Sequence, residues 1–504
     1  MIPLLIIFPF LLAFILPFIT YITKKEIYIK IIFLLGICAP WLFFLSFSNP
    51  VKEVVGGWSR FTGIEVAFGG YGYLFILAEL ILFSLVGIYS LDYFEHDELN
   101  KVFALFLLMH GGLLGTFISK DLFNYYIYME IASASVFGLV AISKIKGSKK
   151  AAFRYITFYF VASYLLILSI AIIYMETGYL NLFLIRENLV VSLEIKVALG
   201  LAFASLILKA GIFPLYFWLP DAHSKAQTPV SALLSGIMVK ASVYGILMLF
   251  LYYPISYLQN FLFTVAFSSM IFGMISAIFQ RDAKKLLAYS TISQLGYVLL
   301  GFATLNIQGA IYHAFAHAIT KTGLFLGVGT LVHSQKTRDL KKLTYGGNYI
   351  LLFSILMLSI SISGIYPFIG SYSKNIILSG IEGYWVHLFY FVNVGTIIYY
   401  AKLNYFLLKG KRKSSIKYRF SIMVLISSLL VLGFGLYFGP ALKVLDLLLI
   451  VLAMIVFFML LNLNLYSFKF DELLLGKPKE IGNENNLLVS IFTIFLILIL
   501  LQGL

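Results

Sequence analysis

A ladder of basic side chains is the part of this sequence best suited to chemistry. The stretch IYHAFAHAITKTGLF places His313, His317 and Lys321 four residues apart. At that spacing the side chains lie on one face of a helix, about 6 Å apart along its axis. Histidine titrates near neutral pH and can release a proton from either ring nitrogen, so the pattern favours a proton relay. A zinc site is the alternative, but this stretch offers no cysteine or acidic ligand.

Three further ionisable residues lie inside long apolar segments. Glu130 is in NYYIYMEIASASVFGLV, Lys209 is in ASLILKAGIFPLYFW, and Lys240 is in SGIMVKASVYGIL. An ionisable side chain near the centre of a membrane helix costs at least about 2.5–3.5 kcal/mol and usually has a function. Burial favours the neutral form of a lysine and a nearby carboxylate favours its charged form, so such groups can bind and release protons. A static ion pair that fixes helix packing is the structural alternative.

The composition indicates that membrane helices position these residues. Of the 504 residues, 61% are hydrophobic and only 12% are charged, and no polar stretch is long enough to form a soluble domain. About sixteen apolar segments are long enough to cross a hydrocarbon core of roughly 30 Å. They lie at 2–23, 29–48, 70–91, 101–119, 121–144, 155–175, 194–218, 229–252, 257–280, 285–303, 308–333, 349–378, 384–408, 420–439, 441–465 and 487–503.

The loops between these segments predict the orientation of the chain. Basic clusters follow the first, fifth, eleventh and thirteenth segments, within residues 24–30, 144–154, 336–342 and 409–419. All four loops lie on one side, so the positive-inside rule places them in the cytoplasm and the N-terminus outside the cell. Membrane loops therefore account for the net charge of +15, and nucleic-acid binding is not expected.

An internal repeat predicts two interrupted helices. The sequences GIFP at 211–214 and GIYP at 364–367 each lie inside a long apolar segment. Pro214 and Pro367 each free a backbone carbonyl from its helical hydrogen bond. Breaks at matching positions of two inverted halves point to an ion or substrate site, and a pair of packing kinks is the alternative. Lys374 follows the second break and either joins the site or extends to the outer interface.

At these motifs the sequence resembles the antiporter-like family. That family comprises the large pumping subunits of respiratory complex I, Mrp cation/proton antiporter subunits, and subunits of membrane-bound hydrogenases and related archaeal complexes. The matching motifs are DLFNYYIYMEIASAS from Asp121, KAGIFPLYFWLPDAHSKAQTPVSALLSGIMVKASVYGI from Lys209, RDAKKLLAYSTISQLGYVLLGF from Arg281 and YHAFAHAITKTGLFLGVGTL from Tyr312. Within the family, LPDAHSKAQTPVSALLSG is most similar to the archaeal hydrogenase-type and Mrp D-type subunits.

The resemblance implies fourteen core helices, so together with the apolar segments it predicts an all-α polytopic membrane fold with about 14–16 transmembrane helices. N-terminal helices would occupy 1–100, and C-terminal helices would occupy 409–504. Two inverted five-helix repeats, each with a broken helix, would lie between them at 101–252 and 257–408.

The resemblance also implies roles for the ionisable residues. Glu130 and Lys209 would form a coupled carboxylate–lysine pair, and Lys240 would connect that pair to the relay formed by the ladder. Lys374 would be the terminal lysine of the second half. The family often has a histidine where this chain has Tyr216, so protons would arrive through water or through His223 instead.

The sequence has no Walker A loop, dinucleotide-binding fingerprint or cluster-binding cysteine motif, so no cofactor or metal is expected on this chain. The preferred function is translocation of protons, with sodium as the other candidate ion. The chain would be a non-catalytic subunit of a membrane-bound hydrogenase or sulfur-reducing complex in the plasma membrane. Its partners would be further antiporter-like subunits, small Mrp-type subunits and a redox module. An Mrp antiporter subunit, a complex I subunit and an independent solute transporter are the alternatives.

Overall fold

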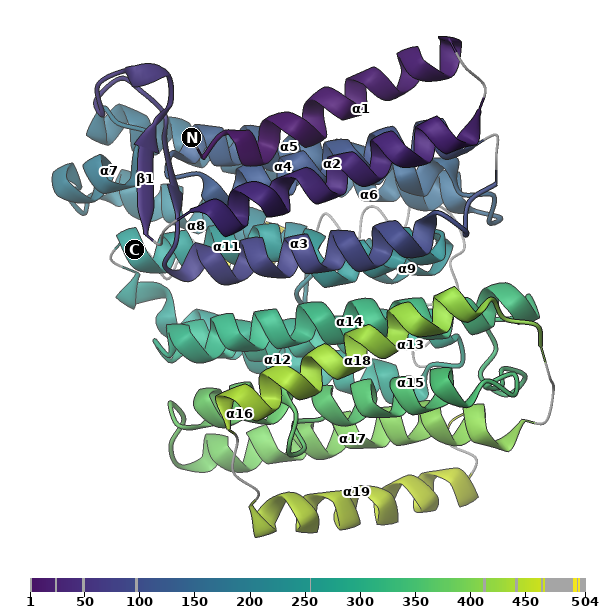
Figure 1. The fold of residues 1–504 in the computed structure, drawn as a ribbon. Coiled ribbons are helices and arrows are strands. Elements are labelled where there is room, and N and C mark those ends of the chain that lie inside the picture. The colour runs from purple at the N-terminus through teal and green to yellow at the C-terminus, as the bar shows by residue number, and fades with distance from the viewer. Residues whose placement is uncertain are drawn as a thin grey trace. The chain divides into compact units, whose positions relative to one another are not determined.

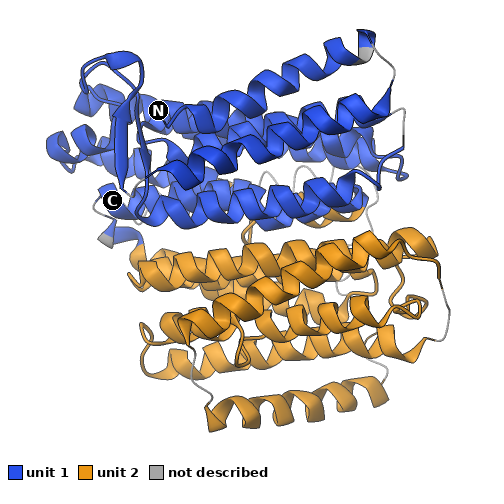
Figure 2. Ribbon diagram, in the orientation of Figure 1, with its two compact units in different colours: residues 1–210, 225–258, 498–504 blue, residues 211–224, 259–497 orange. Residues whose placement is uncertain are grey.

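The chain folds into two compact helical units. A computed structural model describes residues 2–22, 25–47, 50–95, 98–253, 255–410, 414–439, 443–463, 466, 493–495 and 497–498. Unit 1 comprises residues 1–210, 225–258 and 498–504, and unit 2 comprises 211–224 and 259–497 (Figure 2). Eleven of the described helices are long and apolar enough to cross a membrane. The all-helical membrane fold predicted from the sequence is thereby confirmed.

Unit 1 holds the first half of the helices and a small β-hairpin at one end of them (Figure 1). Strands β1 (Val51–Val54) and β2 (Glu65–Phe68) pair antiparallel, with Val51 opposite Phe68. The helices are α1 (Leu4–Ile22), α2 (Glu26–Ser46), η1 (Val55–Gly57), α3 (Tyr71–Ser90), α4 (Leu99–Ile118), α5 (Leu122–Ile142), α6 (Ser148–Thr177), α7 (Leu182–Asn188), α8 (Leu193–Ala210), α10 (Thr228–Leu233), the π-helical η3 (Leu234–Met238), α11 (Val239–Tyr252) and η4 (Ser256–Leu258).

Unit 2 repeats the all-helical architecture, and its last described long helix, α19, packs along α17 (Figure 1). The helices are α9 (Leu219–Lys225, whose last residue falls in unit 1), α12 (Gln259–Phe279), α13 (Ala283–Ala303), α14 (Ile307–Gln335), α15 (Tyr349–Ile362), α16 (Ile369–Leu378), α17 (Tyr384–Lys409), α18 (Tyr418–Phe438) and α19 (Val444–Asn462).

Polar side chains set the first residues of the helices that carry the site. Asp121 caps α5 by accepting a hydrogen bond from the backbone N–H of Asn124. Asp282 caps α13, and Asn348 caps α15, in the same way. Such caps satisfy backbone N–H groups that have no partner within the helix. The first residues of α5, α13 and α15 are therefore defined by local sequence.

Two of the expected membrane segments are interrupted where the repeat predicts. The segment at 194–218 is helical only to Ala210, where α8 ends, and the segment at 349–378 divides into α15 and α16. In both breaks a glycine has positive φ, +69° at Gly211 and +81° at Gly364, and the following X–Pro peptide is cis. Glycine tolerates this backbone conformation without steric strain.

The other expected segments agree with observed helices to within a few residues, apart from α6, which begins seven residues earlier. The expected segment at 487–503 lies almost entirely outside the described residues. The hairpin, the short helices α7 and α9, and the π-helical turn η3 were not expected. The proposed repeat boundaries at 101–252 and 257–408 stay predictions.

Candidate functional site

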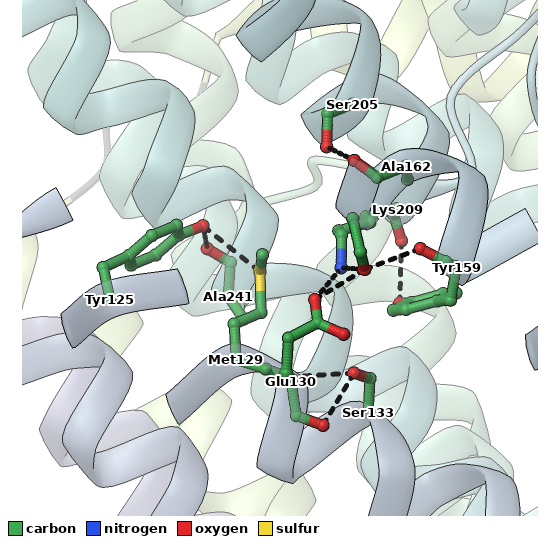
Figure 3. Close-up of polar contacts among 10 residues, drawn as sticks. Tyr125, Met129, Glu130, Ser133, Tyr159, Ala162, Ser205, Lys209 and Ala241 are labelled. Carbon is green, nitrogen blue, oxygen red and sulfur yellow. Dashed lines mark hydrogen bonds and ion pairs between the residues drawn. The ribbon is translucent and has the colours of Figure 1, made fainter. Parts of the chain in front are cut away.

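A buried ion pair joins α5 to α8 in unit 1. The Lys209 ammonium lies 2.6 Å from Oε1 of Glu130 (Figure 3). The Lys209 side chain is 0% exposed, whereas the Glu130 side chain is 25% exposed. The two residues predicted to act as a pair are therefore in direct contact, with the lysine on the interior side.

Ser163 of α6 completes a three-way contact with this pair. Its hydroxyl accepts a hydrogen bond from Lys209 Nζ at 2.9 Å and donates one to Glu130 Oε1 at 2.6 Å. The Lys209 ammonium also lies 4.9 Å from the centre of the Tyr159 ring, a distance at which an aromatic face attracts a cation. Lys209 thus has one charged partner and two neutral partners.

The helix break stands one residue beyond Lys209. Because α8 ends at Ala210, the carbonyl of Lys209 has no partner further along the same helix. The Tyr159 hydroxyl donates a hydrogen bond to that carbonyl at 3.0 Å. Tyr159 therefore contacts both the side chain and the backbone carbonyl of Lys209, and this contact connects the end of α8 to α6.

Lys240 lies just after an irregular turn of helix in the same unit. It is the second residue of α11, directly beyond the π-helical η3, and is 1% exposed. Its ammonium donates a hydrogen bond at 2.8 Å to the carbonyl of Ser235, which is within η3. π-Helical turns inside α-helices are often found at functional sites.

In unit 2, the ring of Tyr297 lies against both His313 and Lys374. The His313 ring centre is 5.6 Å from that of Tyr297, and the Lys374 ammonium is 4.4 Å above the Tyr297 ring. Lys374 is 4% exposed and donates a hydrogen bond at 2.8 Å to Asn393 Oδ1. Lys374 is therefore part of an interior cluster, and the alternative that it extends to the outer interface is wrong.

His313 is held at both ring nitrogens. Nδ1 lies 3.0 Å from the Ser373 hydroxyl, and Nε2 lies 3.1 Å from Oε1 of Gln294. The Gln294 amide oxygen can only accept, so Nε2 donates in that bond, whereas the donor between Nδ1 and the Ser373 hydroxyl depends on the protonation of the ring. Because Ser373 is adjacent to Lys374 in α16, this contact connects the histidine to the second broken helix.

The rest of the ladder is also buried. His317 and Lys321 are both 0% exposed, and Lys321 donates hydrogen bonds to the Ser290 hydroxyl and, at 3.0 Å, to the carbonyl of Leu287. Both partners belong to α13, as does the Gln294 that contacts His313. His313 and Lys321 therefore face the same helix, as the four-residue spacing predicts.

Similar sequences and structures identify the family. Residues 119–398, more than half of the chain, match the family described as NADH:quinone oxidoreductase/Mrp antiporter, TM. The chain belongs to this family. Its described helices and interrupted segments are those of an antiporter-like membrane subunit, so it is a multi-pass membrane protein.

Three relatives within the family show the range of complexes in which such chains occur. NADH-quinone oxidoreductase subunit N of Desulforudis audaxviator is 33% identical over 67% of this chain and 71% of its own. The D-type Na(+)/H(+) antiporter subunit of Alkalihalophilus pseudofirmus is 30% identical over 64% and 67%. A solved chain of the membrane-bound sulfane sulfur reductase, an archaeal respiratory membrane complex, superposes with a TM-score of 0.80 at 27% identity, over 86% of this chain and 94% of its own.

Tyr216, which departs from the histidine implied by the family resemblance, lies in an aromatic cluster. Tyr216 is 4% exposed, and its ring centre is 4.5 Å from that of Phe272. His223 is 0% exposed and stacks on Phe325 at 4.9 Å. The His223 ring is thus enclosed in this structure. Uptake of protons through His223 stays a prediction.

The buried ionisable residues that were not singled out from the sequence include Glu79 and His110. Glu79 lies at the centre of α3 and His110 near the centre of α4, and both are 0% exposed. The rule that singled out Glu130, an ionisable residue in a long apolar segment, applies equally to them. Among the described residues, no group of three or more His, Cys, Asp or Glu side chains is placed to hold a metal ion.

Proposed function

We propose that this chain translocates protons as the antiporter-like subunit of a redox-driven respiratory complex, of the membrane-bound hydrogenase or sulfane sulfur reductase type. The observation that carries the proposal is the buried contact between Lys209 and Glu130 at the end of a broken helix. A fully buried lysine beside a carboxylate whose own charge can change can be made to hold or release a proton. The likeness to the sulfane sulfur reductase chain supports the type of complex.

The geometry suggests how Lys209 would be switched. While Glu130 is ionised and 2.6 Å away, its charge stabilises the ammonium form of the lysine. If Glu130 is protonated or moves away, the ammonium is left in an apolar interior where an uncompensated charge is costly. The lysine then releases its proton, and the family resemblance orders Lys240, the ladder and Lys374 as the carriers that follow.

The chain would work only inside a larger assembly. We infer that its partners are further antiporter-like subunits, small Mrp-type subunits and a redox module that carries the cofactors. The location would be the plasma membrane, with the N-terminus outside, since the basic loops then face the cytoplasm. The three relatives described above all bear the names of parts of multi-subunit systems, which supports membrane partners.

A sodium/proton antiporter subunit is the second candidate. The 30% identical relative from Alkalihalophilus pseudofirmus, named as part of a Na(+)/H(+) antiporter, favours it. The two candidates differ in what drives proton movement. A redox-driven subunit needs electron transfer, whereas an antiporter subunit needs only a sodium gradient.

The test is proton uptake by inverted membrane vesicles that contain the assembled complex. Electron donor should produce a proton gradient in the wild type, and Lys209→Ala should abolish it while the amount of complex stays the same. Lys150→Ala is the matched control because Lys150 is an exposed lysine at the start of α6. Full uptake by Lys209→Ala would defeat the proposal. Uptake driven by sodium alone, without electron donor, would favour the antiporter candidate.

A further inference from the structure

A second buried acid–base pair lies in unit 1, between α3 and α4. Oε1 of Glu79 is 2.6 Å from Nδ1 of His110, and both side chains are 0% exposed. The imidazole also stacks on Phe83, with ring centres 4.5 Å apart. The contacts that hold Glu130 and Lys209 do not include either residue.

The far atoms of this pair make no hydrogen bond within the described part of the chain. These atoms are Oε2 of Glu79 and Nε2 of His110, and both are buried. A pair with only a packing role is expected to be fully satisfied, because an unmade buried hydrogen bond costs about 1–3 kcal/mol. Two open polar atoms on adjacent side chains are instead suited to accept a proton or a water molecule that delivers one.

The packing of α3 places this pair level with Lys240. Helix α3 packs against α10, η3 and α11. Near its start, the Phe75 ring lies 5.4 Å from the ring of Tyr244, and just beyond its end the Tyr93 hydroxyl bonds to Thr228 at 3.3 Å. The two segments therefore run antiparallel.

The register of these contacts defines the depth of each group. Glu79 is four residues after Phe75, and Lys240 is four residues before Tyr244. Because the helices are antiparallel, the step from Phe75 to Glu79 and the step from Tyr244 to Lys240 both run about 6 Å in the same direction along the helix axes. Residues four positions apart also lie on the same face of a helix. Glu79 and Lys240 thus lie at one depth, on the sides of α3 and α11 that meet.

We infer that Glu79 and His110 form a proton-holding site that exchanges protons with Lys240, either directly or through water. The inference rests on the proposed function and adds a branch to it. In the exchange, an N–H bond of the Lys240 ammonium breaks and an O–H or N–H bond forms on the pair. The lysine becomes a neutral amine while the charge of the pair rises from −1 to zero. The reverse step recharges the lysine.

A proton is the ligand that this site fits. A metal ion would need at least one more metal-binding side chain. In the described part of the chain, no third His, Cys, Asp or Glu joins the two. The pair has the acid and the imidazole that commonly transfer protons in proteins.

The decisive variant is Glu79→Gln in the assembled complex. Glutamine keeps the size of the side chain and can still hydrogen-bond to His110, but it cannot exchange a proton. Donor-driven proton uptake should fall by about tenfold or more, because a positioned proton-transfer group typically contributes roughly 10²–10⁴-fold. Ser90→Ala is the matched control. Ser90 is a buried polar residue of the same helix, whose hydroxyl bonds only within α3 among the contacts described, and uptake should be unchanged.

A spectroscopic measurement separates a proton-holding role from a packing role. Infrared difference spectra of the wild-type complex, recorded between its resting and energised states, should contain a carboxylic-acid C=O band that is missing in Glu79→Gln. If this variant assembles poorly, His110→Gln, which retains the carboxyl, should instead shift that band and lower uptake.

The outcomes distinguish the inference from the function on which it rests. Wild-type uptake and an unchanged infrared spectrum in Glu79→Gln, with uptake abolished in Lys209→Ala, would overturn the inference and leave the function standing. Full uptake in Lys209→Ala would overturn the function itself, whatever the result at Glu79.

Discussion

Lys209 has partners that differ in what they can do when the site changes state. Glu130 can lose its charge by binding a proton, whereas Ser163 and the Tyr159 ring stay neutral. Neutral partners hold the ammonium in place but do not control whether it keeps its proton. That control therefore comes from the charge of Glu130, whose side chain is also the more exposed of the pair.

Arginine should not replace lysine at this position. Lys209→Arg keeps the positive charge and can still contact Glu130, but arginine does not release its proton in proteins. We expect donor-driven proton uptake to be lost, while complex isolated from membranes contains the normal amount of this chain. Uptake close to the wild-type rate would mean that Lys209 acts only as a fixed charge.

Ser163→Ala should slow transport without stopping it. The substitution removes the hydroxyl that bridges the pair but leaves the direct 2.6 Å contact between Lys209 and Glu130. A hydrogen bond to a charged group contributes about 1.5–3 kcal/mol, so an initial uptake rate reduced by roughly tenfold is expected. Ser133→Ala is the control, since that hydroxyl bonds only to backbone carbonyls of its own helix among the contacts described. Equal rates in the two variants would argue against a role for the bridge.

At the scale of secondary structure, each interrupted helix has a lysine side chain beside its break. In the second break, a Cβ atom placed on Gly364 would meet Cδ of Lys374 at 2.8 Å, so the lysine side chain lies directly over the break. In the first, the lysine precedes the break by one residue. Both arrangements place a lysine side chain at a helix end, where backbone groups lack partners within their own helix.

A side chain at Gly370 should disrupt the second break. A Cβ atom there would lie 1.8 Å from the carbonyl oxygen of Ser361, which is backbone and cannot easily move. We expect Gly370→Ala to destabilise the subunit by about 1–3 kcal/mol, as overpacking does, and to lower the thermal midpoint of the purified complex. Gly433→Ala on α18 is the control, because its added Cβ has no described atom within 4 Å apart from its chain neighbours and the backbone of its own helix. Identical midpoints would contradict the packing seen at Gly370.

The sequence predicts those features that depend on local signals. A glycine three residues before a proline in an apolar segment was enough to find both breaks, and four-residue spacing was enough to place His313 and Lys321 on one face. The contact of Lys209 with Glu130 came from the family resemblance. The pairing of Glu79 with His110 joins two helices whose register depends on tertiary packing, and no local pattern encodes it. The π-helical turn before Lys240 likewise has no signal in residue spacing.

At the scale of the whole molecule, the proposed function assigns proton transfer to this chain and electron transfer to a separate redox module. We therefore expect the purified chain, reconstituted alone in liposomes, to form no proton gradient when electron donor is supplied. Adding back the complete complex should restore the gradient. A gradient formed by the isolated chain would show that it is an independent transporter. We also expect residues 466–504 to contact partner subunits, and this segment lies almost wholly outside the described residues.

The unequal exposure of the two buried pairs has a consequence for chemical labelling. Apolar carbodiimides dissolve in lipid and attach covalently to protonated carboxyl groups that they can reach. Glu130, with a quarter of its side chain exposed, should be modified in the isolated chain, whereas the fully enclosed Glu79 should be spared. Peptide mass spectrometry would locate the adduct, and comparing the isolated chain with the assembled complex would reveal whether a neighbour covers α5. Adducts on Glu79 at the same rate as on Glu130 would show that the α3–α4 contact opens readily.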